Sequence, residues 1–172
     1  MYYDPSYGNY AVSRPWETFS LPQVNREDEY DINTNMPEAL KLIEDAVKGE
    51  TEDRLFYQYL IDTAPSPRDK EIIAGIRDDE MRHYSLFREL YQRLTGNALP
   101  NIQSMEFERP ASYCAGLYKA LFGEQSAVTR YRRILYAMRD RRDINILIGI
   151  VTDELRHLGL YNYLYAKNGC SD

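Results

Sequence analysis

Two short stretches of the sequence carry its only two histidines. Residues 78–83 read DDEMRH and residues 152–157 read TDELRH, so each histidine follows a glutamate by three positions and an aspartate by four. On a helix, residues three apart leave the same face, so each Glu-x-x-His pair points both side chains in one direction. Imidazole and carboxylate groups at such spacing are typical metal ligands. The two stretches therefore predict a metal site that two helices share.

The two stretches belong to an internal repeat with an offset of 74 positions. Each half contains a Gly-Glu pair, a tyrosine seven positions later, and an Asp-Glu-x-Arg-His sequence whose glutamate lies 30 positions after the first. The first half supplies Gly49, Glu50, Tyr57, Asp79, Glu80, Arg82 and His83, and the second supplies Gly123, Glu124, Tyr131, Asp153, Glu154, Arg156 and His157. The halves differ widely elsewhere, so the repeat singles out these positions.

Hydrophobic periodicity predicts that helices position these residues. Helix breakers near residues 64–67, 96–110 and 139–143 leave four long helices, at about 37–63, 67–95, 111–138 and 143–167. The first and third connections are short, which predicts two antiparallel hairpins. The middle connection can reach about 50 Å when extended, and a 28-residue helix is about 42 Å long, so it can run the length of the bundle. We expect an all-α, ferritin-like four-helix bundle of two hairpins joined by a long crossover.

The second and fourth predicted helices each carry a stripe at core spacing that includes ionisable residues. The stripes are Ile73, Ile76, Glu80, His83, Phe87, Leu90 and Leu94, and Leu147, Ile150, Glu154, His157, Tyr161 and Leu164. Burying unpaired ionisable groups costs several kcal/mol each, and a bound metal is the simplest compensation.

The bends of the two hairpins place the acids at one level. Glu50 and Glu80 each lie 15 positions from residue 65, and Glu124 and Glu154 each lie 15 positions from residue 139. One glutamate from each of two helices and Glu-x-x-His from each of the other two is the ligand set of a carboxylate-bridged dinuclear site. The predicted ligands are Glu50, Glu80, His83, Glu124, Glu154 and His157. Hard carboxylate oxygens with one imidazole per ion suit two iron ions, with manganese or a mixed Mn/Fe pair as alternatives.

On these motifs, residues 37–167 resemble the ferritin-like di-iron superfamily, and the duplication with Gly-Glu-x6-Tyr is most similar to rubrerythrin-type proteins. The resemblance implies that Glu50 and Glu124 are terminal ligands and that Glu80 and Glu154 bridge the two ions. It also implies that Tyr57 and Tyr131 hydrogen-bond ligand carboxylates. The Asp-Glu-x-Arg-His form is similar to that of bacterial multicomponent monooxygenases, which implies that Asp79 bonds His157 and Asp153 bonds His83. Arg82 and Arg156 would balance these aspartates.

The sequence also departs from the rubrerythrin pattern. It contains two cysteines, too few for the four-cysteine rubredoxin domain, so a separate rubredoxin-like or flavoprotein electron donor is expected for a peroxidase. Ala127 stands where rubrerythrins have a further glutamate, whereas Asp53 lies three positions after Glu50 and is either a seventh ligand or a solvated charge. Met81 is expected to point outward as an interfacial side chain, with haem ligation as the alternative. The repeated Gly49 and Gly123 suggest that helices approach closely there.

Composition limits the partners and the compartment. The formal net charge of −6 argues against a nucleic-acid partner. No apolar run is long enough to span a membrane, and residues 1–10 do not resemble a signal peptide. We therefore expect a cytoplasmic protein in which Cys114 and Cys170 are reduced thiols. Residues 1–35, rich in Tyr and Pro, form an N-terminal extension that is either flexible or packed along the domain at 36–172.

Three functions are compatible with these features. The leading hypothesis is a dinuclear-metal oxidoreductase that acts on O2 or H2O2, expected as a homodimer. The second is an iron-binding and storage protein with a ferroxidase site in a large hollow cage. The third is a structural protein that retains the metal site and assembles through its Tyr-rich extension. A storage cage needs a large multimer, and a dimer rules it out. The structural role predicts that function remains when both histidines are replaced by alanine.

Overall fold

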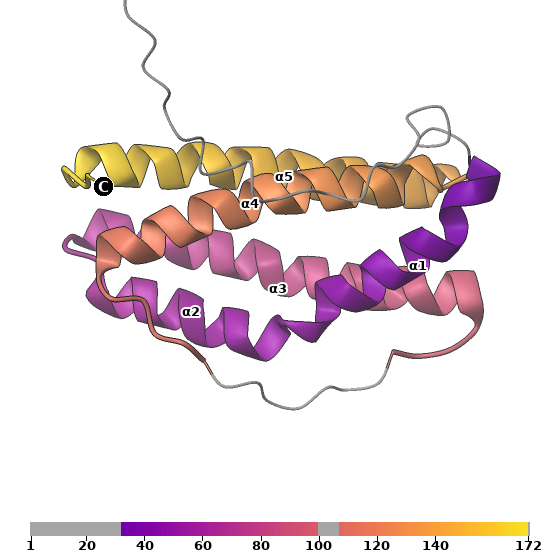
Figure 1. The fold of residues 1–172 in the computed structure, drawn as a ribbon, viewed down its shortest axis with the longest axis horizontal. Coiled ribbons are helices and arrows are strands. Elements are labelled where there is room, and N and C mark those ends of the chain that lie inside the picture. Colours follow the sequence, from indigo (N-terminus) through magenta and orange to yellow (C-terminus); the bar gives the residue numbers. More distant parts are fainter. Residues whose placement is uncertain (1–31, 100–106, 172) are drawn as a thin grey trace, which may run out of the picture.

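The computed structural model describes residues 32–99 and 107–171, and all regular elements in these ranges are α-helices. The chain forms α1 (Ile32–Lys48), α2 (Glu50–Thr63), α3 (Pro67–Thr95), α4 (Tyr113–Tyr136) and α5 (Arg141–Lys167). They lie side by side in an elongated bundle (Figure 1). The predicted all-α class is confirmed. Of the predicted extension, residues 1–31 lie outside the described ranges, and α1 begins just after them.

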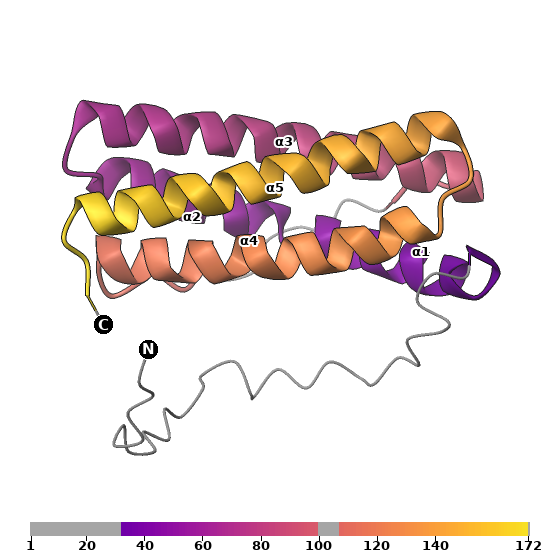
Figure 2. The same cartoon turned by 90° about the horizontal axis from the view of Figure 1, so that it is seen from above.

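The helices follow the predicted boundaries closely except at the start of the bundle. α2 and α3 run in opposite directions on either side of a short bend, as do α4 and α5, while α3 ends and α4 begins at opposite ends of the bundle (Figures 1 and 2). The first predicted helix, 37–63, is instead two helices. The chain turns at Gly49, and α2 starts at Glu50.

Side-chain caps fix where three of the helices begin. Ser66 accepts a hydrogen bond from the backbone N–H of Asp69 at the start of α3, and Pro67 occupies the first turn. Ser112 caps α4 and Asp140 caps α5 in the same way. Each cap satisfies a backbone donor that the first helical turn leaves free, which contributes about 1 kcal/mol. At its other end α3 stops at Gly96, whose φ of 75° lies in the left-handed region that favours glycine.

Two apolar clusters stabilise the bundle, one on each side of a polar middle. One cluster packs α1 against the later part of α3 and includes Ile43, Phe87 and Ile134. The other packs α2 against the earlier part of α3 and includes Leu60, Ile73 and Leu164. The predicted stripes on α3 and α5 run through both clusters, and Glu80, His83, Glu154 and His157 lie buried between them. No helix in the described ranges is long and apolar enough to cross a membrane.

Crossed ion pairs join the two ends of α3 and α5. Asp69 in the first turn of α3 accepts hydrogen bonds from Lys167 at the end of α5, and Asp143 in the first turn of α5 accepts from Arg93 near the end of α3. Both aspartates are buried. They differ by the repeat offset of 74 positions, as do Arg93 and Lys167. These pairs fix how α3 and α5 lie along each other, and therefore the level at which their central residues meet.

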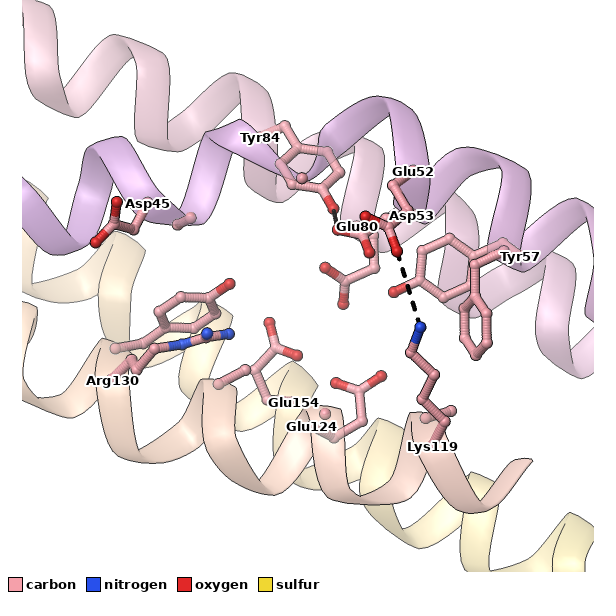
Figure 3. A pocket seen from close by; sticks show the side chains of 17 residues that line it. Asp45, Glu52, Asp53, Tyr57, Glu80, Tyr84, Lys119, Glu124, Arg130 and Glu154 are labelled. Atoms are coloured by element: carbon pink, nitrogen blue, oxygen red, sulfur yellow. Dashed lines mark hydrogen bonds and ion pairs between the residues drawn. The ribbon is translucent and has the colours of Figure 1, made fainter. Parts of the chain in front are cut away.

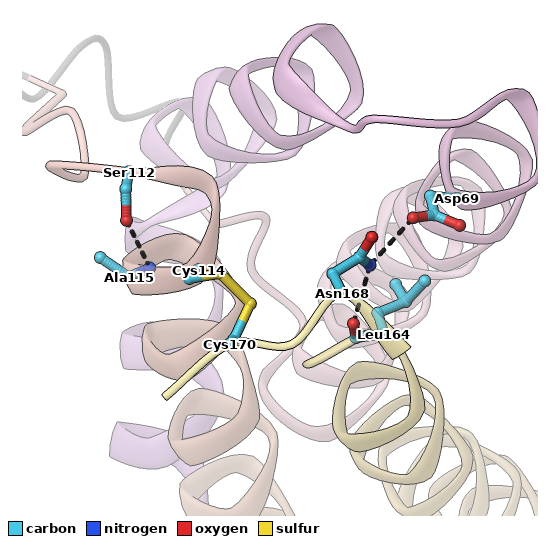
Figure 4. The surroundings of a disulfide bond; sticks show 7 residues. All are labelled: Asp69, Ser112, Cys114, Ala115, Leu164, Asn168 and Cys170. Atoms are coloured by element: carbon cyan, nitrogen blue, oxygen red, sulfur yellow. Dashed lines mark hydrogen bonds between the residues drawn. A yellow bond between two sulfur atoms is a disulfide. The ribbon is translucent and has the colours of Figure 1, made fainter. Parts of the chain in front are cut away.

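The expectation of two reduced thiols is wrong for this structure. Cys114 at the start of α4 and Cys170 after α5 form a disulfide, with their Cα atoms 5.5 Å apart (Figure 4). Because α4 and α5 are antiparallel, these two ends lie together. Gly169 at φ 64° turns the chain after α5, with hydrogen bonds from the N–H groups of Gly169 and Cys170 to Ala166 and Tyr165. The turn directs Cys170 towards α4.

Candidate metal centre

The centre is built on α3 and α5, where the two Glu-x-x-His pairs face each other. The imidazole rings of His83 and His157 have their centroids 6.0 Å apart. His157 Nδ1 lies 3.1 Å from Glu80 Oε1 on the other helix and 3.8 Å from Glu154 on its own helix. His83 Nδ1 lies 3.1 Å from Glu154 Oε1 and 3.6 Å from Glu80. Each of these glutamates is thus close to both imidazoles, the placement that a bridging carboxylate needs.

α4 adds a third carboxylate to this group. Glu124 Oε2 lies 3.7 Å from His157 Nδ1. One ligand atom from each of Glu80, Glu124, Glu154 and His157 can be chosen so that all lie within 4.8 Å of one another, and all four residues are buried. A single ion can therefore contact all four. Three of the four predicted glutamate ligands and both histidines come together as the sequence analysis expected.

Four atoms at this centre are buried without a hydrogen-bond partner in the described structure. They are Glu80 Oε1, His83 Nδ1, Glu154 Oε1 and His157 Nδ1. Leaving one buried polar atom unsatisfied costs about 1–3 kcal/mol, and more for a charged group. Such atoms are uncommon in folded proteins and call for an explanation. All four are atoms that can bind a metal, so the donor set fits a metal ion.

The other nitrogen of each imidazole makes the crossed contact predicted from the sequence. His83 Nε2 lies 3.2 Å from Asp153 Oδ2, and His157 Nε2 lies 3.4 Å from Asp79 Oδ2. An N–H donated to a carboxylate fixes the imidazole so that its Nδ1 is free to bind a metal, and it also raises the basicity of the ligand. As predicted, the aspartate of each half therefore contacts the histidine of the other half.

The arginines complete this arrangement symmetrically. Arg82 donates to Asp153 at 2.9 Å and to Asp79 at 3.2 Å. Arg156 donates to Asp79 at 2.6 Å and to Asp153 at 3.0 Å. Burial raises the pKa of Asp79 and of Asp153, but their hydrogen bonds from Arg156 and a histidine outweigh it and hold both pKa values below the ordinary range. The two aspartates therefore stay ionised as acceptors for the imidazoles.

The carboxylates favour positive charge at each Nδ1. Burial lowers the pKa of His157, but the nearby Glu124, Glu154 and Glu80 outweigh it and raise that pKa to about 12. Glu154 and Glu80 raise the pKa of His83 to about 10 in the same way. In turn the imidazoles hold the pKa of Glu154 below its ordinary value against burial, whereas burial raises that of Glu124 to about 9. A proton or a metal ion bound at Nδ1 would offset the negative charge of these carboxylates.

Glu50 is the predicted ligand that the structure does not bring to the centre. Its carboxylate accepts a hydrogen bond of 2.9 Å from Arg88, and both side chains are partly exposed. Asp53, one turn later on α2, lies beside the centre instead and accepts a hydrogen bond from the hydroxyl of Tyr84. α2 begins at Glu50, directly after a turn at Gly49 that one continuous helix would lack. Periodicity does not reveal such a turn.

A cavity of about 260 Å³ reaches the carboxylates from the side of α1, α2 and α4. The carboxylates of Asp53, Glu80, Glu124 and Glu154 point towards its centre (Figure 3). Lys119 and Arg130 on α4 line it as well, and Lys119 lies 3.8 Å from Glu52. The imidazoles do not line this cavity, because they approach the carboxylates from the opposite side, on α3 and α5. The cavity therefore offers small molecules a route to the carboxylate side of the centre.

Tyrosines and glycines around the cavity depart from the expectations. Tyr57 and Tyr131 line it, but neither hydroxyl makes the expected hydrogen bond to a ligand carboxylate in the described structure. The expected close helix contact at the repeated glycines is also wrong. A Cβ added to Gly123 would meet nothing within 4 Å, and one added to Gly49 would meet the Asp53 carboxylate at 3.2 Å rather than another helix. Met81 is partly buried on α3, and Ala127 is buried on α4.

Comparison with known proteins gives a fold but no activity. No family model matches the chain. The chain is 28% identical over 145 residues to the uncharacterised protein YhjR of Bacillus subtilis (strain 168), covering 84% of this chain and 93% of that protein. It resembles in structure a hypothetical protein from Pyrococcus furiosus, with a TM-score of 0.64, 20% sequence identity, and coverage of 82% of this chain and 98% of the other. The helical fold is therefore shared with a solved structure.

Proposed function

We propose that this chain is a ferritin-like, rubrerythrin-like oxidoreductase that uses two non-haem metal ions to reduce H2O2 or O2. The observation that carries the proposal is the set of four buried, unsatisfied ligand atoms from Glu80, His83, Glu154 and His157. They come from two helices in a crossed, repeated arrangement. Leaving buried polar atoms without a well-formed hydrogen bond is costly, and a bound metal would satisfy all four.

The chemistry of the donors favours iron or manganese. Carboxylates from Glu80, Glu124 and Glu154 and the Nδ1 atoms of His83 and His157 would hold two ions, and hard oxygen ligands with one imidazole per ion suit Fe and Mn better than Cu(I) or Zn. Two such ions, bound in their reduced state, would supply the two electrons that convert H2O2 and two protons to two molecules of water.

The chain's own residues would orient these ligands and select the substrate. Asp79 and Asp153 hold the imidazoles through Nε2, so that each Nδ1 faces the centre. Arg82 and Arg156 keep these aspartates ionised and in place. The apolar clusters on both sides keep water from the ends of the bundle away from the centre. The cavity of about 260 Å³ lies below the usual range for sites of larger organic ligands, which favours a small oxidant.

Iron loading tests the proposal directly. We expect the anaerobically purified protein to bind two Fe(II) per chain and the loaded protein to be oxidised by H2O2 or O2 within seconds, followed by optical absorption. His83→Ala and His157→Ala should each lower the iron content. Fewer than about one iron per chain in the wild-type protein would overturn the proposal. Faster oxidation by O2 together with a large multimer on gel filtration would favour iron storage, while a dimer favours the oxidoreductase.

The proposal includes a separate rubredoxin-like or flavoprotein electron donor and a cytoplasmic location. Disulfides are rare in the reducing cytoplasm of most organisms, so the bond between Cys114 and Cys170 offers a test of that location. Thiol-specific labelling of freshly lysed cells is expected to find both cysteines reduced if the protein is cytoplasmic. A fully oxidised pair in cells would contradict that compartment and leave the metal chemistry unaffected.

A further inference from the structure

We propose that Asp53, held by Tyr84, is the carboxylate that α2 contributes to the metal pair, and that Glu50 at the repeated Gly-Glu motif is not a ligand. The inference rests on the proposed function, because it concerns the same centre. It would complete a ligand set of four carboxylates and two imidazoles: Asp53, Glu80, His83, Glu124, Glu154 and His157. The metal would be a divalent first-row ion that accepts hard oxygen ligands.

The positions of the two α2 acids differ clearly. Asp53 lines the cavity together with Glu80, Glu124 and Glu154, whereas Glu50 does not line it. In Figure 3 the Asp53 carboxylate lies across the cavity from Glu124 and on the same side as Glu80. Glu50 bonds Arg88 instead, in a pair whose side chains remain 23% and 29% exposed. Glu50 is thus engaged by Arg88 away from the cavity, whereas Asp53 is held beside the other carboxylates.

A hydrogen bond from a buried tyrosine orients the Asp53 carboxylate. The Asp53 side chain lines the cavity together with Glu80 and accepts a hydrogen bond from the Tyr84 hydroxyl. Tyr84 is itself buried on α3, so its hydroxyl holds the aspartate in a fixed orientation. A hydroxyl that bonds one carboxylate oxygen leaves the other free for a metal, which is how outer partners orient ligands.

The local sequence explains the shift from Glu50 to Asp53. In α4 the motif glycine, Gly123, lies inside a continuous helix, and Glu124 points to the centre while Ala127 fills the position one turn later. In the first half, Gly49 precedes a new helix whose first turn is closed by a 2.9 Å hydrogen bond from the N–H of Asp53 to the Gly49 carbonyl. The acid therefore faces inward one turn later, where the second half has alanine.

Gly49 also leaves the space that the Asp53 side chain occupies. A Cβ at position 49 would come within 3.2 Å of Asp53 Oδ2, closer than most side chains tolerate. Glu52 is the other α2 acid at the cavity, and it lies 3.8 Å from Lys119. Asp53 would add a fourth carboxylate to those of Glu80, Glu124 and Glu154.

Equilibrium dialysis against Fe(II) under anaerobic conditions, with iron measured by plasma mass spectrometry, tests the assignment without an activity assay. The matched variants are Asp53→Asn and Glu50→Gln, which remove one charge each with little change of shape. We expect wild type and Glu50→Gln to bind two iron ions with equal affinity. Asp53→Asn should lose the second ion or bind it at least about 10-fold more weakly. Tyr84→Phe should weaken it by about 10-fold and keep the stoichiometry.

The outcomes separate the two proposals. Loss of the second ion in Glu50→Gln, equal loss in both variants, or no loss in either would overturn the assignment of Asp53 while the metal centre stands. Failure of the wild-type protein to bind two ions would overturn the proposed function and the inference with it. Circular dichroism of each metal-free variant checks that the helices remain, so that a loss of iron reflects the ligand and not unfolding.

Discussion

The two halves of the repeat are alike on one side of the centre and different on the other. On α3 and α5, the crossed contacts of Asp153 with His83 and of Asp79 with His157 are nearly equal, at 3.2 and 3.4 Å. On α2 and α4, the same Gly-Glu motif places Glu124 in the centre and Glu50 outside it. The same motif therefore places its glutamate at the centre only when the helix that carries it continues through the motif.

The shared side is held by contacts between α3 and α5 at three levels. Crossed ion pairs close both ends, and the crossed aspartate–histidine contacts lie in the middle. Both helices are continuous through the centre. α2, by contrast, begins only at Glu50, so the motif acid stands at a helix end instead of inside a helix. The two halves therefore match along α3 and α5, which contact each other at both ends and in the middle, and differ at the start of α2.

Replacing Asp79 or Asp153 tests whether the two halves are equivalent on α3 and α5, and it should change iron binding most. Asp79→Asn and Asp153→Asn each remove the carboxylate that accepts from one imidazole, so each should weaken Fe(II) binding by about 10- to 100-fold, or about 1.4–2.7 kcal/mol. The two losses should agree within a few-fold because the two contacts are alike. Equilibrium dialysis of the metal-free proteins against Fe(II) measures both.

Asp78→Asn is the matched control, because Asp78 lies on the same helix but is exposed and pairs with Arg77. It should bind iron as the wild-type protein does. A loss confined to one of the two central aspartates would show that the metal ions are held unequally on the α3–α5 side as well.

Most of the fold could be predicted from the sequence, because long helices with capped ends have strong local signals. The bounds of α3 agree with the predicted 67–95, where Ser66, Pro67 and Gly96 mark both ends. The stripes of α3 and α5 placed Glu80, His83, Glu154 and His157 in the interior, as found. The resemblance to multicomponent monooxygenases supplied the crossed aspartates, since spacing alone does not say which histidine an aspartate contacts.

The errors have physical causes that a pattern does not contain. The helix expected at 37–63 contains a turn at Gly49, and beyond that turn Asp53 rather than Glu50 lines the cavity. The pairing of Cys114 with Cys170 depends on the turn at Gly169, which brings two distant cysteines within 5.5 Å between Cα atoms. Such contacts depend on how helices end, and a count of cysteines does not reveal them.

Two further substitutions compare how much each end of the α3–α5 pair contributes to the free energy of unfolding. Arg93→Ala should lower the free energy of unfolding by about 2 kcal/mol, because Asp143 is buried and loses its side-chain partner. Lys167→Ala should cost only about 1 kcal/mol, because the buried Asp69 keeps hydrogen bonds from Ser66 and Asn168. Urea unfolding of the metal-free proteins measures both. Equal losses would show that the ends are equivalent after all.

Acid pH supplies an internal control for Lys167→Ala. Burial raises the pKa of Asp69, but hydrogen bonds from Lys167, Ser66 and Asn168 outweigh it, so its folded-state pKa lies below the ordinary value. The stability that this group contributes is present above its unfolded-state pKa, about 4, and is lost as the pH falls through the folded-state pKa. The difference between wild type and Lys167→Ala should therefore shrink below about pH 4. A difference that grows in acid would contradict the ionised pair.

The smallest expected effect separates the two motif glycines. Gly123→Ala replaces a glycine inside α4 where an added Cβ meets nothing within 4 Å, so it should stabilise the protein by about 1 kcal/mol through helix propensity. Gly49→Ala adds a Cβ 3.2 Å from Asp53 Oδ2, so crowding should cancel most of that gain. Thermal unfolding of the metal-free proteins compares the two.

Iron binding by the same pair shows what the crowding does to the centre. If Asp53 is the α2 ligand, Gly49→Ala should weaken binding of the second Fe(II) severalfold because the carboxylate must move, whereas Gly123→Ala should leave it unchanged. If Glu50 were the ligand instead, an alanine at position 49 would strengthen the continuous helix that brings Glu50 inward, and iron binding would hold or improve. The sign of the change at one glycine therefore tells which acid the first half uses.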